Sequence, residues 1–433
     1  MRDKLKLILA GTAALAALAG CGGGSLSVED AEVRLVNATS DIPTLDLYQS
    51  STLVSTGIAS GTAGPYVGLK ADSYTFNLNL GGSGAVAATL LATVQKKVDY
   101  TIVASTSGGT LTATLLTDSE GSPSSGTAKL RLFNTDAADV ASVDAYLLTT
   151  ACSGLAASPA APLVTAVTGL QASYTQVIAA SGGTPYHLCV TAAGDKSDLR
   201  LDIPTLTLAA GQISTVILTR SAGGVLLNSF VLNQQGSLMT ASNASARMRL
   251  AVGASGGALV TATASGVSLG TNLPAPAVAS YVLVPSGPVT LAATIGGTAV
   301  ADPGLTATPG ADLTLLVAGT AATPPVLIVD DNSASTSTAN PVKLRLVNGQ
   351  NGSAPATLTD NYINVGNAAA FGTSSGYAQV QVSTALALLQ ASSGTTPLCQ
   401  SVNVTLTAGN VYSVFLLGDV PAAPVACAIT EDR

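Results

Sequence analysis

A short motif repeats four times along the 433-residue chain. Each copy holds an arginine between two apolar residues, and three of the four copies begin with a basic residue. The arginines are 97, 118 and 96 residues apart (131−34, 249−131 and 345−249). This period is longer than a helical solenoid repeat and fits one small β domain per copy. The copies are Glu32–Leu35, Lys129–Leu132, Arg247–Leu250 and Lys343–Leu346.

A tyrosine follows each of these arginines at a matching distance. The separation is 32 residues in the first, third and fourth copies (66−34, 281−249 and 377−345) and 43 residues in the second (174−131). The second copy therefore contains a local insertion, which includes Cys152, Pro159 and Pro162. The common spacing indicates that the copies share one fold. The tyrosines are Tyr66, Tyr174, Tyr281 and Tyr377.

Each copy also contains short runs in which apolar and polar residues alternate. In the first copy these runs are Val33–Val36 and Leu45–Tyr48, with the turn sequence Asp41–Pro43 between them. Alternation with a period of two predicts half-buried strands. Charged residues make up only 9% of the chain, which suits strands and turns more than surface helices. We therefore expect tandem immunoglobulin-like β-sandwich modules at residues 31–119, 127–234, 245–331 and 341–433, joined by linkers rich in Ser, Gly, Thr and Asn.

The N-terminus has the layout of a secretory signal peptide, with basic residues at positions 2, 4 and 6 before the apolar stretch Leu7–Leu18. That stretch is too short to span a bilayer. Leu18–Cys21 resembles the bacterial lipobox, which implies cleavage before Cys21 and attachment of diacylglycerol to its sulfur. We expect a signal peptide at residues 1–20 and a lipidated tether at residues 21–30. An ordinary signal peptide with an incidental cysteine is the alternative.

A triacylated N-terminus buries far more methylene groups than a single myristoyl chain, so the anchor should be permanent. Gly22 stands where an aspartate would favour retention in the inner membrane of a Gram-negative host. We therefore expect an outer-membrane lipoprotein of the cell envelope, carrying palmitate-type acyl chains, with its periplasmic or surface face left open. The expected partners are the membrane and other envelope or surface proteins.

The charge of the mature chain argues against nucleic acid as a partner. Removing residues 1–20 leaves 14 Lys and Arg (17−3) and 23 Asp and Glu (24−1), a net charge of −9. Phosphate binding requires clustered basic residues, which this sparse charge distribution does not provide. A chain of this length is expected to divide into several domains.

The four remaining cysteines lie two in the second copy and two in the fourth. Four cysteines allow three connectivities, and pairing within each copy requires no contact between modules. We therefore expect the disulfides Cys152–Cys189 and Cys399–Cys427, which fit an oxidising compartment. A metal site is the rival interpretation, but there is no Cys-x-x-Cys spacing and His187 is the only histidine. We expect no metal and no cofactor.

The phrase from Val33 to Tyr48 contains an arginine, an Asn-Ala pair, an Asp-x-Pro turn and an Asp-x-Tyr ending. It resembles a bacterial domain family of unknown function, numbered 4397, that occurs in secreted and surface-anchored proteins. The likeness extends to Tyr66–Tyr74 and is partial in the second copy, at Asn134 and Val143–Tyr146. It is faint in the third copy, where Thr261 replaces the acid, and in the fourth. The resemblance implies an extracytoplasmic β-sandwich without an established activity.

Candidate catalytic residues are few. His187 could act as the general base of a Ser-His-Asp site, but the chain has no nucleophile elbow, so we expect an ordinary strand residue. The acidic pairs Glu29-Asp30, Asp330-Asp331 and Glu431-Asp432 fall in predicted linkers or at the chain end and are expected to be solvated. Asp330–Asn332 nevertheless offers oxygen ligands of the kind calcium prefers.

Two further patterns have a structural and a binding interpretation. Arg34 with Asp46, and Arg131 with Asp144, predict cross-strand ion pairs that fix strand register, with a ligand-binding pair as the alternative. The four repeated tyrosines are expected in the core or at a strand corner, with the hydroxyl bonded to backbone. A sugar-stacking platform is less favoured, because aromatic residues make up 4% of the chain and tryptophan is absent.

These patterns favour a non-catalytic, membrane-anchored scaffold with a structural, adhesive or protein-interaction role. The alternative is a periplasmic or surface protein that binds a small ligand or glycan, which a concave patch of converging polar side chains would support. A hydrolase is a further rival, and its Ser-His chemistry would depend on His187.

Overall fold

The computed structural model describes residues 30–432, apart from 108–109, 138–140, 172, 180–184, 222, 330–340, 353, 383–385, 422 and 424. The predicted lipidation residue Cys21 and the calcium candidates Asp330–Asn332 lie outside the described residues. Strands dominate the described part, which confirms the expected all-β fold. None of the described helices is long and apolar enough to cross a membrane.

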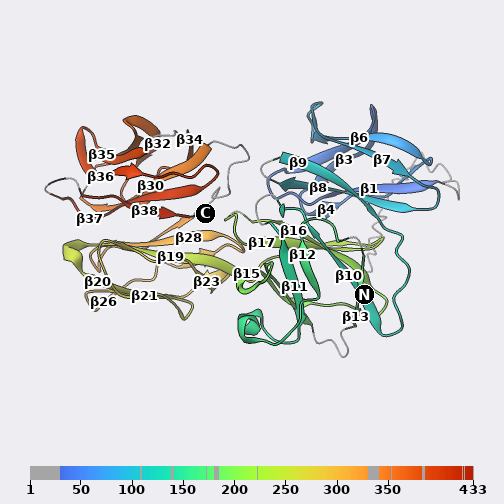
Figure 1. Cartoon of the computed structure of the whole chain (residues 1–433), viewed down its shortest axis with the longest axis horizontal. Coiled ribbons are helices and arrows are strands. Elements are labelled where there is room, and N and C mark those ends of the chain that lie inside the picture. The colour runs from blue at the N-terminus through green and yellow to red at the C-terminus, as the bar shows by residue number, and fades with distance from the viewer. Residues whose placement is uncertain are drawn as a thin grey trace, which may run out of the picture.

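Each module is a sandwich of two sheets (Figure 1). We call the sheet that contains the repeated arginine the inner sheet, and the other the outer sheet. The inner sheet of module 1 contains β1 (Ala31–Asn37), β4 (Thr62–Ala63), β5 (Val67–Leu69), β8 (Asp99–Ser107) and β9 (Thr110–Thr117). Its outer sheet contains β2 (Thr44–Gln49), β3 (Thr52–Ala59), β6 (Asp72–Leu80) and β7 (Val86–Val94).

Module 2 repeats this arrangement and adds the short 3-10 helix η1 (Cys152–Ala157) in its insertion. Its inner sheet contains β10 (Thr127–Asn134), β13 (Thr175–Ile178), β16 (Ile213–Arg220), β17 (Leu227–Asn233) and β18 (Leu238–Ala241). Its outer sheet contains β11 (Val143–Leu148), β12 (Val164–Val167), β14 (Tyr186–Ala192) and β15 (Asp195–Leu206). β18 extends this module beyond Gln234, into a segment that we expected to be a linker.

Module 3 has the same two sheets and a separate pair, β24 (Gly287–Val289) with β27 (Leu305–Ala307). Its inner sheet contains β19 (Ser245–Ala254), β22 (Ala277–Val278), β23 (Val282–Pro285), β28 (Asp312–Gly319) and β29 (Val326–Val329). Its outer sheet contains β20 (Leu259–Ala264), β21 (Val267–Pro274), β25 (Leu291–Ile295) and β26 (Thr298–Val300), and the 3-10 turn η3 (Ser255–Gly257) connects the sheets.

Module 4 completes the series. Its inner sheet contains β30 (Pro341–Asn351), β33 (Thr373–Ser374), β34 (Ala378–Gln381), β37 (Val411–Asp419) and β38 (Ala428–Glu431). Its outer sheet contains β31 (Ala356–Asp360), β32 (Ile363–Ala369), β35 (Ala387–Ser393) and β36 (Thr396–Val404).

The arginine strand of every module runs parallel to a strand from the second half of that module. The pairs are β1 with β8, β10 with β16, β19 with β28, and β30 with β37. In all four the register sets the arginine opposite a threonine or serine, as with Arg34 and Thr101. Because successive side chains of a strand point to opposite faces, the arginine faces away from the core of its own module.

The inner sheets are buried on both faces, because the modules pack in pairs. Leu35 belongs to the core of module 1, whereas its neighbour Val36 packs against module 2. An apolar layer of Val36, Ala38, Val103, Leu116, Phe133, Ile217 and Leu232 joins modules 1 and 2. A second layer of Ala251, Leu316, Ala318, Ile328, Val347, Phe415 and Leu417 joins modules 3 and 4.

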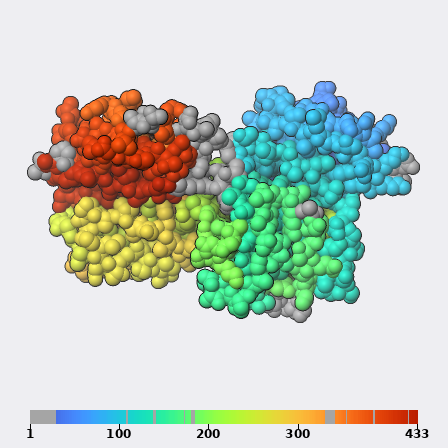
Figure 2. Space-filling model, in the orientation of Figure 1, coloured from blue at the N-terminus to red at the C-terminus, as the bar shows by residue number. Residues whose placement is uncertain are grey.

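The two pairs form two lobes that meet through modules 2 and 3 (Figure 2). Contacts between those modules are mainly polar: Ser221 Oγ lies 2.7 Å from Gly310 O, and Ser286 Oγ donates to Asn243 O at 3.0 Å. The contacts between modules 2 and 3 thus differ from the apolar layers that join modules 1 and 2 and modules 3 and 4.

Both expected disulfides are present. Cys152 is bonded to Cys189, which ties η1 to β14, and Cys399 is bonded to Cys427 within module 4. In the chain-entropy model each closed loop restricts the unfolded chain, a stabilisation on the order of 3 kcal/mol.

Candidate functional site

The repeated arginines form one recurring cluster with the repeated tyrosines. Each arginine Nε donates to the hydroxyl opposite it, and each guanidinium carbon lies 4.4–4.5 Å from the centre of a tyrosine ring. The arginines are at most 4% exposed, so this cation–π contact is desolvated. The Nε bonds are Arg34 to Thr101 (2.8 Å), Arg131 to Thr215 (2.9 Å), Arg249 to Thr314 (2.9 Å) and Arg345 to Ser413 (2.7 Å).

In modules 1 and 2 the clusters meet around Asp118, the residue after β9. Its Oδ2 lies 3.3 Å from Arg34 Nη2 and accepts a hydrogen bond from the Tyr66 hydroxyl at 2.5 Å. Arg34 then crosses to module 2, where Nη1 donates to Gly236 O at 2.6 Å. In the opposite direction, Arg131 Nη2 donates to Thr117 O at 3.3 Å. We call this arrangement joint 1–2.

In modules 3 and 4 the shared acid is Asp432, the residue after β38. Arg249 of module 3 donates from Nη1 to Asp432 Oδ1 at 2.6 Å. Asp432 Oδ2 accepts from the hydroxyls of Ser413 (2.5 Å) and Tyr377 (2.8 Å), and lies 3.9 Å from Arg345 Nη2. One carboxylate therefore binds arginines from two modules, and we call this arrangement joint 3–4.

Burial and neighbouring charges shift the pKa values of two groups in these joints. Burial alone would raise the pKa of Asp432, but the positive charges of Arg249 and Arg345 and the hydrogen bond from Ser413 outweigh it, so the pKa is lowered. Burial and the neighbouring Asp118 carboxylate raise the pKa of Tyr66 far above its usual value. Asp432 is therefore a charged partner in joint 3–4, and Tyr66 is a neutral donor in joint 1–2.

The predicted ion pairs Arg34–Asp46 and Arg131–Asp144 are wrong. Each arginine lies in an inner sheet, whereas Asp46 on β2 and Asp144 on β11 lie in outer sheets. Asp46 instead accepts hydrogen bonds from Gly57 N (2.7 Å) and the Thr56 hydroxyl (2.8 Å). The hydrogen bond from Gly57 lowers the pKa of Asp46. The acid thus caps an irregular turn of the neighbouring strand.

The expectation for the tyrosines is only partly met. The rings are held against arginines rather than offered as an open stacking platform. The hydroxyls of Tyr66 and Tyr377 bond to carboxylates, not to backbone as expected for corner tyrosines. The repeat spacing of the sequence identifies the tyrosines but not their partners, because each partner carboxylate lies at the end of the module, far from the tyrosine in sequence.

The acids of both joints were missed. Asp118 was given no role and Asp432 was placed among solvated terminal charges, yet their side chains are 3% and 1% exposed. The available signal was positional, since each follows the last strand of its module directly. The repeated asparagines also have a role, because Asn37 Nδ2 donates to Ile42 O and Ile58 O, which ties the inner sheet to the outer one.

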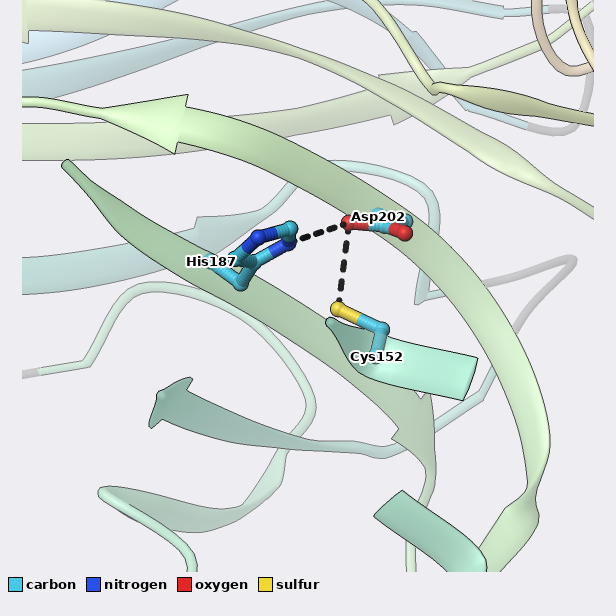
Figure 3. Close-up of side chains that lie close together, drawn as sticks. All are labelled: Cys152, His187 and Asp202. Atoms are coloured by element: carbon cyan, nitrogen blue, oxygen red, sulfur yellow. Dashed lines mark hydrogen bonds and ion pairs between the residues drawn. The ribbon is translucent and has the colours of Figure 1, made fainter. Parts of the chain in front are cut away.

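A different group of polar side chains lies on the outer sheet of module 2 (Figure 3). Asp202 Oδ1 is 3.5 Å from His187 Nδ1 and 3.1 Å from Cys152 Sγ. Since Cys152 is in a disulfide, its sulfur carries no proton and the second contact is not a hydrogen bond in this state. Burial raises the pKa of Asp202, against the lowering effect of His187. The cysteine is therefore not a free nucleophile in this state.

A cleft of about 520 Å³ lies on module 2 where it meets module 3, which contributes Ser286 and Pro309 to the lining. Its walls combine aliphatic side chains with hydroxyl groups, including those of Thr205, Thr207, Thr240, Ser242 and Ser286. Asn243 also lines it, but its side chain binds the chain itself, donating to Arg200 O and Leu227 O at 2.9 Å. The cleft is therefore a concave, uncharged surface.

Comparisons with known proteins give little on function. No curated protein matches the chain. Among solved structures, the Bacillus anthracis TIE protein is 10% identical over 67% of this chain and 50% of that chain, with a TM-score of 0.14. The chain thus spans about half the length of that protein, and a TM-score this low carries no argument.

A family match covers the first part of the chain. Residues 31–146 match the family model described as "Domain of unknown function (DUF4397)". The match starts with β1, spans module 1 and ends in β11, after the second arginine strand. The resemblance stated from the sequence is confirmed there, and residues 31–146 carry a DUF4397-like domain.

Proposed function

We propose that this chain is a lipid-anchored protein of the cell envelope, on the outer membrane, whose modules form a non-catalytic scaffold for structural or adhesive contacts. The lipobox-like sequence ending at Cys21 supports the anchor. The observation that carries the scaffold role is the burial of all four repeated arginines in the clusters at the module joints. The repeated arginines would thus hold paired modules in a fixed relative position, as a rigid spacer requires.

The anchor is tested by the intact mass of the membrane-extracted protein, before and after reduction. We expect a chain that starts at Cys21, carries acyl groups, and gains four hydrogens when its two disulfides are reduced. Cys21→Ala is the matched variant and should leave the membrane fraction. An unlipidated wild-type chain, or a variant that stays membrane-bound, would contradict the anchor.

The scaffold role predicts fixed distances between paired modules. Spin labels at the exposed positions Leu259 in module 3 and Tyr362 in module 4 should give one narrow distance distribution. The same labels in an Asp432→Ala chain should give a broader distribution, since joint 3–4 has lost its acid. A broad distribution in the wild-type background would argue against a rigid scaffold.

The cleft between modules 2 and 3 favours a second candidate, a protein that binds a small uncharged ligand or glycan. The hydroxyl-lined wall offers donors and acceptors without charge. Thr207→Trp should fill the cleft and remove binding in a screen of neutral oligosaccharides, whereas Thr93→Trp on module 1 should not. If no neutral oligosaccharide binds the wild-type chain, the binding function is contradicted and the scaffold role is the one proposal that remains.

A further inference from the structure

We propose that the group around Cys152 is a redox-gated zinc site. In this proposal, reduction of the Cys152–Cys189 disulfide releases two thiolates, which bind Zn²⁺ together with His187 and Asp202. Formation of the disulfide expels the metal. The site is a property of module 2 and does not depend on the scaffold role proposed above.

The outer sheet places three of the four ligands next to one another. His187 and Cys189 are two residues apart on β14, so their side chains share a face. Asp202 on β15 stands directly opposite Cys189 in the antiparallel register. The insertion of module 2 then brings Cys152 over the same face on η1. Cys152, His187 and Asp202 therefore converge from three elements (Figure 3), and Cys189 lies on the same face of β14 as His187.

Three of the four donor atoms are already close to a coordination geometry. The ligand atoms of Cys152, His187 and Asp202 all lie within 4.8 Å of one another. Tetrahedral zinc with bonds of about 2.0–2.3 Å requires ligand atoms about 3.3–3.8 Å apart. The distances of 3.1 Å and 3.5 Å from Asp202 Oδ1 to the sulfur and to Nδ1 are near this range. For these three ligands only small side-chain rotations are needed, whereas Cys189 Sγ, bonded to Cys152 Sγ in the disulfide, must move away from it after reduction.

The covalent bond between the sulfurs is what closes the site. Two disulfide sulfurs stand about 2 Å apart and carry no charge, so they cannot act as two zinc ligands. A dithiol reductant supplies two electrons and two protons to the disulfide, giving two thiols, and is itself oxidised to a disulfide. Zn²⁺ then displaces both thiol protons, while neutral His187 binds through Nδ1 and Asp202 binds as a carboxylate.

The insertion should stay in place once the disulfide opens. Lys196 Nζ on β15 donates to Ser158 O at 2.9 Å and to Ala160 O at 2.7 Å, just beyond η1. Leu155 of η1 is also 1% exposed and packs with Tyr146. These contacts do not involve the sulfurs, so Cys152 remains near His187 and Asp202 in the dithiol state.

The second disulfide of the chain is an internal control. Cys399 and Cys427 lie in module 4, whereas the sole histidine of the chain lies in module 2. Among the described residues, the group of metal-ligand type is that of Cys152, His187 and Asp202. Two thiolates without the histidine and the carboxylate should bind zinc much more weakly.

The test uses the full purified chain, reduced with a phosphine under inert gas and titrated with Co²⁺ and then Zn²⁺. We expect one Co²⁺ per reduced chain, with sulfur-to-cobalt charge-transfer and tetrahedral ligand-field bands that Zn²⁺ abolishes. The oxidised chain should show neither band. Release of about two protons per Zn²⁺ provides an independent readout.

Four variants assign the ligands. The double variant Cys152→Ser, Cys189→Ser should lose the bands, and Cys399→Ser, Cys427→Ser should keep them. His187→Ala and Asp202→Asn keep the disulfide and hence the fold, and each should weaken binding at least about 10-fold. Absence of the bands in the reduced wild-type chain would overturn the proposal. So would bands that persist without Cys152 and Cys189, or affinities unchanged by both His187→Ala and Asp202→Asn.

Discussion

At the scale of single residues, one carboxylate holds modules 3 and 4 together. Asp432 binds Arg249 of one module and hydroxyls of the other, and its side chain is 1% exposed. Removing one partner of a buried ion pair leaves an unpaired charge, at a cost of about 3–5 kcal/mol. We therefore expect Asp432→Ala to lower the free energy of unfolding by about this amount in denaturant titrations.

The neighbouring acid provides the control for this substitution. Glu431 is exposed and accepts one hydrogen bond, from Asn410 Nδ2. Glu431→Ala should change the free energy of unfolding by about 0.5 kcal/mol or less. Equal effects of the two substitutions would show that Asp432 does not hold the joint.

The same carboxylate gives joint 3–4 a defined response to acid. Because the pKa of Asp432 is lowered on folding, the unfolded chain binds its proton more tightly than the folded one. Its stabilisation is complete above the ordinary value of 3.8 and is lost as the pH falls through the lower folded-state pKa. Melting temperatures measured from about pH 5 to about pH 2 should fall more steeply for the wild type than for Asp432→Asn. Parallel profiles would contradict this.

The repeated arginines and tyrosines could be found from sequence because each recurs within one short period. Asp118 and Asp432 could not be assigned by that signal, since module 2 has Gln234, not an acid, directly after β17. Whether such an acid is solvated depends on the partner module that covers it. Burial of an acid by another module depends on how the modules pack, which the local sequence pattern does not encode.

At the scale of strands, the acid of the DUF4397-like phrase has a local role. Asp144 accepts hydrogen bonds from Ala166 N (2.8 Å) and Gly194 N (2.9 Å), and Ala166 has a φ of 52°. In module 3 the hydroxyl of Thr261 accepts from Asn272 N (2.9 Å), where φ is 50°. The position therefore caps an irregular strand with either an acid or a hydroxyl.

This role predicts the effect of truncation. Asp144→Ala removes acceptors from two backbone N–H groups, which should cost about 1–3 kcal/mol in thermal or denaturant unfolding. Asp144→Asn keeps one carbonyl acceptor and should lose less. An alanine variant as stable as the wild type would show that the capping bonds are not needed.

Strand positions were predictable because alternation is local, but strand partners were not. We expected Arg34 and Asp46 on adjacent strands, since they are close in sequence. The chain instead crosses to the outer sheet at Asp41–Pro43, and β1 pairs with β8, 67 residues away at Arg34 and Thr101. The alternation of apolar and polar residues does not show which distant strand pairs in parallel with β1.

At the scale of the whole molecule, modules 3 and 4 approach each other closely at two glycines. A Cβ on Gly253 would lie 2.5 Å from Gly349 O, and a Cβ on Gly349 would lie 2.6 Å from Leu316 Cδ1. Gly253→Ala should therefore force modules 3 and 4 apart and lower the melting temperature. Gly84→Ala, where nothing lies within 4 Å, is the matched control and should have little effect. Equal stability of both variants would contradict the tight approach.

The burial of both faces of each inner sheet predicts which parts of the chain fold alone. Modules 1 and 2 share an apolar layer, and so do modules 3 and 4, whereas modules 2 and 3 meet mainly through polar contacts such as Ser221 with Gly310. A fragment of residues 30–244 should therefore fold and melt cooperatively. A fragment of residues 127–329 also has two modules, but it would expose the inner faces of both, including Phe133 and Leu316. It should melt at a lower temperature and aggregate, since exposed apolar patches of this kind promote association. Calorimetry and light scattering on the two fragments decide the matter, and equal behaviour would show that the unit of folding is the single module rather than the pair.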